Sequence, residues 1–328
     1  MYGYTTFHPQ TAQSLIDSVR HGTASHAYIF EGAPGMYKTE TAKLFANALV
    51  CRDKDNTPCG ECPSCKEAQL GTCPDIIFVE HGKGADGKPK KSIGVEEARD
   101  LSADSLKKPF GSPRKVYIIP DGENLTMEAQ NALLKTLEEP PEYAVFIIII
   151  PSAAQLLQTI ISRSTVVSFN AVPSEMIRGY IQKKYPHKSE SADFLTKYCE
   201  GVPGMADKLA ADEEFDDLRS KTLSMMNALV SKNPQDAFKI QEFISENKDR
   251  AKEIYDMWLS FLRDISVIHC GNTEAVINSD KLDTLRTLCA RIDLKRCIRG
   301  AELIVESEEM MSKAVKLSAA ALRLALLL

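Results

Sequence analysis

The chain has 328 residues, of which 44% are hydrophobic, enough to fill the cores of two or three domains. Its formal net charge of −5 gives no general attraction to nucleic acid, so DNA contact would depend on local basic clusters. The sequence has two such clusters, each more typical of a solvated loop: Lys83, Lys88, Lys90 and Lys91, and Lys107, Lys108, Arg114 and Lys115. The sequence has no signal-peptide pattern and no uncharged apolar stretch of membrane-spanning length. We therefore expect a cytoplasmic protein without a membrane partner.

Residues 28–39 follow the pattern of a phosphate-binding loop, in which a strand runs into a glycine-rich loop and a helix then begins. Gly32, Gly35, Lys38 and Thr39 occupy the positions that this geometry needs, but Tyr37 replaces the last glycine. The backbone there must pass close to the phosphates, and tyrosine adds a β-carbon and a ring. The sequence predicts a nucleotide-binding scaffold whose pocket binds ATP or ADP weakly or not at all.

Four of the nine cysteines lie in one short segment, at Cys51, Cys59, Cys62 and Cys65, where Pro and Gly residues turn the chain. Thiolates set this close suit a structural zinc ion with four ligands. The alternative is a set of unligated or redox-active thiols. The remaining cysteines stand at apolar positions and are expected to fill cores: Cys73, Cys199, Cys270, Cys289 and Cys297.

Apolar, β-branched segments predict the strands of a parallel sheet buried on both faces, at residues 76–80, 116–119, 146–150 and 166–169. Helical patterns at 95–106 and 126–137 alternate with them. This order predicts a doubly wound α/β domain, with ligands at the carboxyl ends of the strands. At one such end an active ATPase carries Asp-Glu, whereas this chain has Pro120 and Asp121. Asp121 is more readily explained as a turn residue than as a catalytic base.

Several motifs together resemble the AAA+ clamp-loader subunits of bacterial DNA polymerase III. They are His26–Phe30 before the phosphate loop, the four-cysteine insert, Cys73-Pro74-Asp75, the segment from Asn131 to Pro141, and Ser162-Arg163-Ser164. The last resembles the family's Ser-Arg-Cys motif with the cysteine replaced, and the first cysteine spacer is one residue shorter than is usual. The motifs cover about the first half of the chain.

The resemblance implies three domains: an AAA+ ATPase-like domain at 1–169 with a zinc module at 51–65, a helical lid at 170–210, and an all-helical collar at 211–328. In the family the collar holds five subunits in a ring. Apolar residues at helical spacing between 250 and 270, followed by Gly271 as a cap, fit such a bundle. The last segment, 314–328, is apolar on most sides and is expected to be buried against a partner.

The family contains ATP-hydrolysing motor subunits and a delta-prime class that is a poor or inactive ATPase. Besides Tyr37 and Pro120, Ile150 replaces the polar residue that senses the γ-phosphate, and residues 201–205 lack the arginine of the second sensor. These four changes favour the delta-prime class. The alternative is a motor subunit in which Lys38, Thr39 and Asp121 still hydrolyse ATP. A zinc-dependent DNA-binding adaptor is disfavoured by the acidic charge.

The resemblance gives Arg163 a role as an arginine finger that acts in trans on ATP held by a neighbouring subunit. The implied partners are the other clamp-loader subunits, the sliding clamp and, through the complex, primed DNA. The alternative is a local structural bond of Arg163. Glu138 and Glu139 do not form an acid–base pair, because adjacent residues on a helix point in different directions, and we expect their basic partner on a neighbouring subunit.

Overall fold

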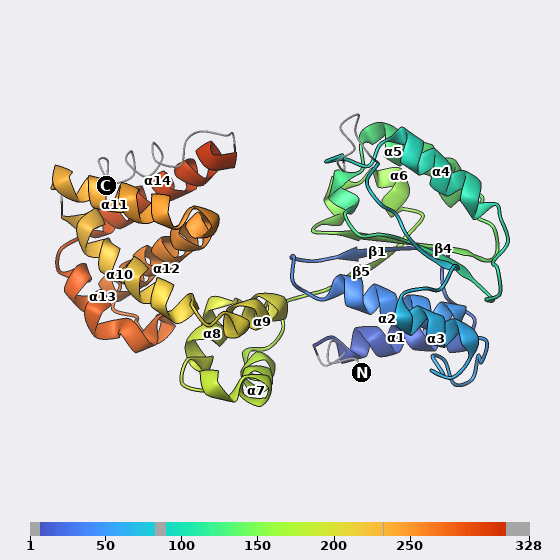
Figure 1. Ribbon diagram of the computed structural model, residues 1–328, viewed down its shortest axis with the longest axis horizontal. Coiled ribbons are helices and arrows are strands. Elements are labelled where there is room, and N and C mark those ends of the chain that lie inside the picture. Colours follow the sequence, from blue (N-terminus) through green and yellow to red (C-terminus); the bar gives the residue numbers. More distant parts are fainter. Residues whose placement is uncertain (1–6, 83–89, 232, 313–328) are drawn as a thin grey trace. The chain divides into compact units, whose positions relative to one another are not determined.

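The computed structural model describes residues 7–82, 90–231 and 233–312 (Figure 1). The chain divides into two compact units near residue 176, with residues 202–204 belonging to the first unit. The predicted helix at 314–328 lies outside the described residues.

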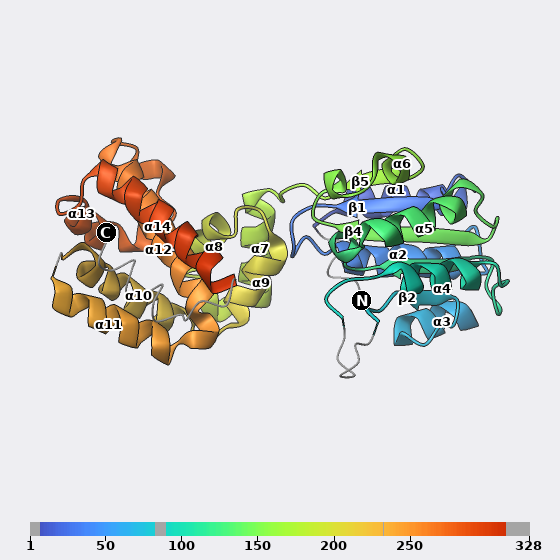
Figure 2. The ribbon, with the colours of Figure 1, turned by 90° about the horizontal axis from the view of Figure 1, so that it is seen from above.

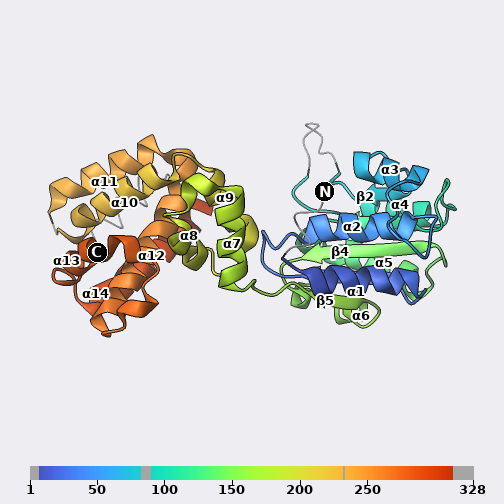
Figure 3. The ribbon, with the colours of Figure 1, turned by 90° about the horizontal axis from the view of Figure 1, so that it is seen from below.

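The first unit contains a sheet of five parallel strands in the order β2-β3-β4-β1-β5. The strands are β1 Ala27–Glu31, β2 Ile76–Phe78, β3 Lys115–Ile119, β4 Ala144–Ile150 and β5 Thr165–Ser168. Helices cover both faces: α1 Pro9–Arg20, α2 Lys38–Val50 and α3 Pro63–Leu70 lie on one, and α4 Val95–Ser105, α5 Met127–Glu138 and α6 Gln158–Ile161 lie on the other (Figures 1 and 3). The predicted doubly wound α/β fold is confirmed.

The core of this unit lies around the three central strands. Every residue of β3 and β4 is buried, and only Glu31 of β1 is partly exposed. The expectation that all strands are buried on both faces was wrong for β2 and β5, where Val166 for example is 39% exposed. These short strands form the edges of the sheet, so each has a neighbour on one side only.

The helices that follow are α7 Ser174–Lys184, α8 Ala192–Tyr198, α9 Pro203–Ala211, α10 Phe215–Val230, α11 Pro234–Glu246, α12 Ala251–His269, α13 Leu282–Cys289 and α14 Leu294–Ser312. Helix α12 packs against α10, α13 and α14 (Figure 2). Its buried apolar stripe confirms the predicted bundle core, and Trp258 in that stripe donates from Nε1 to the carbonyl of Thr222 at 3.1 Å. Gly271 has the left-handed φ of 77° expected of a helix cap.

Two expectations about individual side chains are wrong. Cys270 is exposed at the end of α12 rather than buried, and Cys289 is only partly buried, whereas Cys73, Cys199 and Cys297 are core residues as expected. Lys115 does not belong to a solvated basic loop. It is buried at the start of β3, where its Nζ lies 2.8 Å from Oδ2 of Asp104. None of the helices in the described part of the chain could span a membrane.

Candidate metal centre and nucleotide-binding loop

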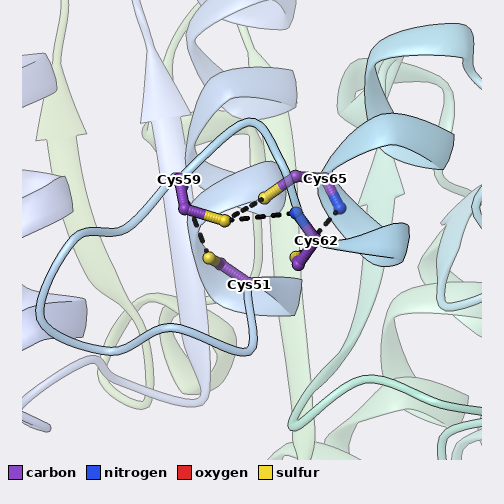
Figure 4. A group of neighbouring side chains, drawn as sticks. All are labelled: Cys51, Cys59, Cys62 and Cys65. Atoms are coloured by element: carbon purple, nitrogen blue, oxygen red, sulfur yellow. Dashed lines mark hydrogen bonds between the residues drawn. The ribbon is translucent and has the colours of Figure 1, made fainter.

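The four clustered cysteines come together where the chain runs from the end of α2 into the first turn of α3 (Figure 4). Cys51 follows the last residue of α2, Cys62 caps the start of α3, and Cys65 lies in the first turn of α3. The four Sγ atoms all lie within 4.8 Å of one another, and those of Cys59 and Cys65 are 4.0 Å apart. A tetrahedral zinc ion with Zn–S bonds of about 2.3 Å needs sulfurs ~3.8 Å apart, so the set fits zinc with a small contraction.

Backbone amides surround these sulfurs. The amide of Cys59 donates to the sulfur of Cys51 at 3.5 Å, that of Cys62 to the sulfur of Cys59 at 3.4 Å, and that of Cys65 to the sulfur of Cys62 at 3.5 Å. The Cys62 amide, followed by that of Glu61, lowers the pKa of the Cys59 thiol to about 7, whereas burial raises the pKa of Cys65. Amides that donate to sulfur favour thiolates, the form that binds metal. Cys51, Cys59, Cys62 and Cys65 would hold the ion in a closed structural site.

The insert is fastened to the sheet by Asp75, the acidic residue of the Cys-Pro-Asp motif. Its buried carboxylate accepts the backbone N–H groups of Phe110, Gly111 and Ser112 at 2.7, 3.1 and 3.0 Å. The hydroxyl of Ser112 in turn bonds that of Ser64 in α3 at 3.1 Å. Asp75 therefore holds the loop before β3 in place, and Ser112 links that loop to α3 beside the cysteines.

The phosphate-binding loop runs from β1 to α2, as predicted. Its Gly32 has φ 149°, and a β-carbon there would lie 2.6 Å from the carbonyl oxygen of Phe169. Tyr37 adopts the left-handed conformation, φ 56°, that glycine favours, and its ring stacks on Phe7 with centroids 5.6 Å apart. Tyr37 thus has a backbone conformation that is strained for a residue other than glycine, and its ring contact with Phe7 stabilises it there.

Lys38 is directed toward the carbonyl groups of its own loop. Only 8% of the residue is exposed, and Nζ donates to the carbonyl of Gly32 and, at 2.9 Å, to that of Ala33. Burial lowers the pKa of Lys38, an effect opposed by the nearby carboxylate of Glu123.

The structure gathers most of the predicted nucleotide residues around one pocket of about 330 Å³. Its lining includes Gly35, Tyr37, Lys38 and Thr39 from the loop, Pro120, Asp121 and Glu123 after β3, and Ile150 at the end of β4. Gly32 is not part of the lining. The proline and isoleucine thus face the pocket from the strand ends where an active ATPase has polar groups.

His81 also belongs to this region, and no sequence motif predicts it there. Its Nε2 lies 3.2 Å from Oδ2 of Asp121, and its Nδ1 lies 2.9 Å from the carbonyl oxygen of Lys90. The backbone carbonyl oxygen of Asp121 accepts the backbone N–H of Asn124 in a short turn, at 2.9 Å. The position of His81 just beyond β2 could have indicated this contact, because Asp121 follows the neighbouring strand β3.

Arg163 lies in the turn between α6 and β5, outside the lining of this pocket. Its Nη1 donates to the carbonyl of Thr159 at 2.9 Å, and its Nη2 lies 2.8 Å from Oε1 of Glu138. We expected a basic partner for Glu138 on a neighbouring subunit, whereas the structure provides one within the chain. The reason is that the α6–β5 turn lies beside the end of α5, a proximity that sequence spacing does not reveal.

Two family models match the chain. The model described as DNA polymerase III, delta subunit, matches residues 7–173, just over half of the chain. A second model, which describes the C-terminal part of the DNA polymerase III delta subunit, matches residues 213–317.

Among curated proteins, the DNA polymerase III subunit delta′ of Bacillus subtilis is 29% identical over 85% of this chain and 83% of its own length. The tau subunit of the same organism is 28% identical over 94% of this chain, but the match spans only 59% of that relative.

Two solved structures cover most of the chain at low similarity. A gamma-subunit-related protein of Thermotoga maritima has 21% identity and a TM-score of 0.44, covering 89% of this chain and 97% of its own. The Bacillus subtilis clamp loader delta protein has 13% identity and a TM-score of 0.36, covering 96% and 98%. The assignment rests instead on the two family models and on the α/β sheet domain followed by helices. The chain belongs to the DNA polymerase III delta-subunit family.

Proposed function

We propose that this chain is a delta-prime-type stator of the bacterial clamp loader, with little or no ATPase activity of its own. In this role it completes a ring with other clamp-loader subunits, which places a sliding clamp on primed DNA in the cytoplasm. The similarity to the Bacillus subtilis delta′ subunit over most of both chains supports this class.

The observation that carries the proposal is the state of the nucleotide pocket. Hydrolysis of ATP needs a metal-holding carboxylate, a residue that orients water and a polar sensor. Here Pro120 and Ile150 offer no carboxylate and no polar side chain, and Asp121 is engaged by His81. Lys38 bonds the loop carbonyls. Each of these features disfavours the binding or hydrolysis of a nucleotide phosphate, and the four residues concerned, Lys38, Pro120, Asp121 and Ile150, line one pocket.

A stator still contributes to hydrolysis if it supplies a charge to its neighbour's site. Arg163 is suited to this role because its side chain is 35% exposed and the turn that carries it is packed against the domain core. Its guanidinium would stabilise charge on the γ-phosphate of ATP bound next door, an effect worth ~10³ to 10⁵ in rate for arginine fingers.

Zinc has a structural role in this proposal. Bound by Cys51, Cys59, Cys62 and Cys65, it would fix the insert between α2 and α3 while the sheet folds independently of it. We assign residues 170–210 to a lid and 211–328 to the collar, in keeping with the second family match from residue 213.

The motor class is the second candidate, because the tau subunit of Bacillus subtilis aligns with 94% of this chain. In that case Lys38, Thr39 and Asp121 would bind and hydrolyse ATP. The two candidates predict opposite effects of a change at Lys38.

The test is ATP turnover by the isolated chain and by a reconstituted clamp loader that contains either wild-type chain or Lys38→Ala. A stator predicts negligible turnover by the isolated chain and little change in the complex. A large loss of complex turnover with Lys38→Ala, in rings of normal size, would replace the stator with the motor class.

A further inference from the structure

Glu138 and Arg163 form an ion pair that joins two separate elements of the first unit. Glu138 is the last residue of α5, and Arg163 follows α6. Oε1 of Glu138 lies 2.8 Å from Nη2 of Arg163. The carboxylate lies at a helix C-terminus, where negative charge is unfavourable. A cation beside it is therefore stabilising twice, because it neutralises the carboxylate and because it interacts favourably with the helix dipole.

The guanidinium is held on a second side by the end of α6. Its Nη1 donates to the carbonyl of Thr159 at 2.9 Å and approaches the hydroxyl of Ser162 at 3.4 Å. Within the described part of the chain, both hydrogen bonds use Nη1 and the ion pair uses Nη2. The Nε–H group therefore has no partner there and remains available to a further acceptor.

The turn that carries Arg163 is itself fixed. Ile160 of α6 is fully buried in the core beside α5. The side-chain oxygen of the buried Gln130 in α5 accepts the backbone N–H of Leu157 at 2.8 Å, just before α6. Beyond Arg163, the hydroxyl of Ser164 donates to the carbonyl of Ile160 at 2.9 Å. Because these contacts hold the backbone of the turn, Arg163 can change position mainly through rotation of its long side chain.

We propose that Glu138 is a positioning residue for Arg163, holding the guanidinium so that its Nε edge stays available to a phosphate oxygen of the neighbouring subunit's nucleotide. This inference rests on the proposed function of Arg163. A flexible arginine loses side-chain entropy when it engages a phosphate, and a pair formed beforehand reduces that cost. Glu138 itself does not touch the nucleotide.

The experiment compares clamp loaders reconstituted with full-length chains that carry Glu138→Ala, Glu138→Gln or Glu128→Ala. Glu128 is an exposed carboxylate in the first turn of the same helix, which makes it a matched control for the loss of a charge from α5. DNA-stimulated ATP turnover is measured as a function of ATP concentration. We expect Glu138→Ala to lower kcat about two- to five-fold, the factor typical of an exposed ion pair, with KM for ATP unchanged. Glu138→Gln should recover part of the loss, and Glu128→Ala should match wild type.

Repeating the Glu138 changes in an Arg163→Ala chain separates positioning from a general structural effect. The inference predicts no further loss of kcat there, because the group that Glu138 positions is absent. An equal loss in both backgrounds, or no effect of Glu138→Ala while Arg163→Ala slows turnover, would overturn the inference and leave the stator function standing. Unchanged turnover with Arg163→Ala alone would instead remove the finger role and this inference with it. Sizing of every complex controls for assembly.

Discussion

Replacing Tyr37 by glycine tests whether this residue hinders nucleotide binding at the phosphate-binding loop. Glycine relieves the left-handed backbone at φ 56°, which costs a non-glycine residue ~1–2 kcal/mol. The change removes the stacking on Phe7, worth about 0.5–1.5 kcal/mol, and adds chain entropy of about 0.5–1 kcal/mol to the unfolded state. These contributions oppose each other, so the free energy of unfolding should change by no more than ~1.5 kcal/mol.

Nucleotide affinity should respond more clearly than stability. Removing the ring and the β-carbon from the lining frees the backbone to approach phosphate, and we expect roughly tenfold tighter binding, or ~1.4 kcal/mol. Tyr37→Ala is the matched variant, because it removes the ring but keeps the β-carbon at a left-handed position, and it should bind less tightly than the glycine variant.

The assays are calorimetric titration of the isolated chain with ATP and denaturant unfolding. Hydrolysis should stay negligible, since Pro120 and Ile150 remain. A folded Tyr37→Gly chain that binds ATP no better than wild type would show that Tyr37 does not limit nucleotide binding.

Freshly purified, reduced protein should contain about one zinc per chain by metal analysis, and Cys62→Ser should release it while the far-UV spectrum of the sheet domain persists; metal-free wild-type protein would rule the site out. Asp75→Ala should destabilise the fold by on the order of 3 kcal/mol in denaturant unfolding, because three backbone N–H groups lose a charged acceptor, and a change below ~0.5 kcal/mol would contradict this. Lys115, with Tyr117 and Lys107, lowers the pKa of Asp104 to about 2 from an unfolded value near 3.8. Stability from this carboxylate is therefore present above about pH 4 and lost as pH falls toward 2, so the difference between wild type and Asp104→Asn should shrink over that window and stay constant above it.

The parts of the site that sequence could predict are those made by contiguous residues. The cysteines at 51–65 fall within one short segment, and the turns formed by its Pro and Gly residues bring their sulfurs together. This clustering does not depend on how the segment packs against the rest of the fold. The phosphate-binding loop is likewise a local strand–loop–helix motif, and its altered position at Tyr37 could be read directly. Alternating apolar strands and helices were enough to predict the doubly wound sheet.

Pairs between distant residues could not be predicted in the same way. His81 meets Asp121 across 40 positions of sequence, and Arg163 meets Glu138 because α6 packs beside the end of α5. Such pairs depend on strand order and helix packing rather than on spacing. The exposure of β5 was missed for a related reason, since apolar strands at an edge and at the centre of a sheet have similar composition.

The proposed action of Arg163 on a neighbouring subunit's nucleotide can be tested by steady-state, DNA-stimulated ATP turnover of the reconstituted clamp loader. With Arg163→Ala we expect rings of normal size whose turnover and clamp loading are slowed. Arg163→Lys should rescue poorly, because a compact ammonium lacks the planar fork that spans phosphate oxygens. Unchanged turnover in fully assembled Arg163→Ala rings would mean that the arginine serves only its bonds to Glu138 and Thr159, and that it does not act on a neighbour's nucleotide.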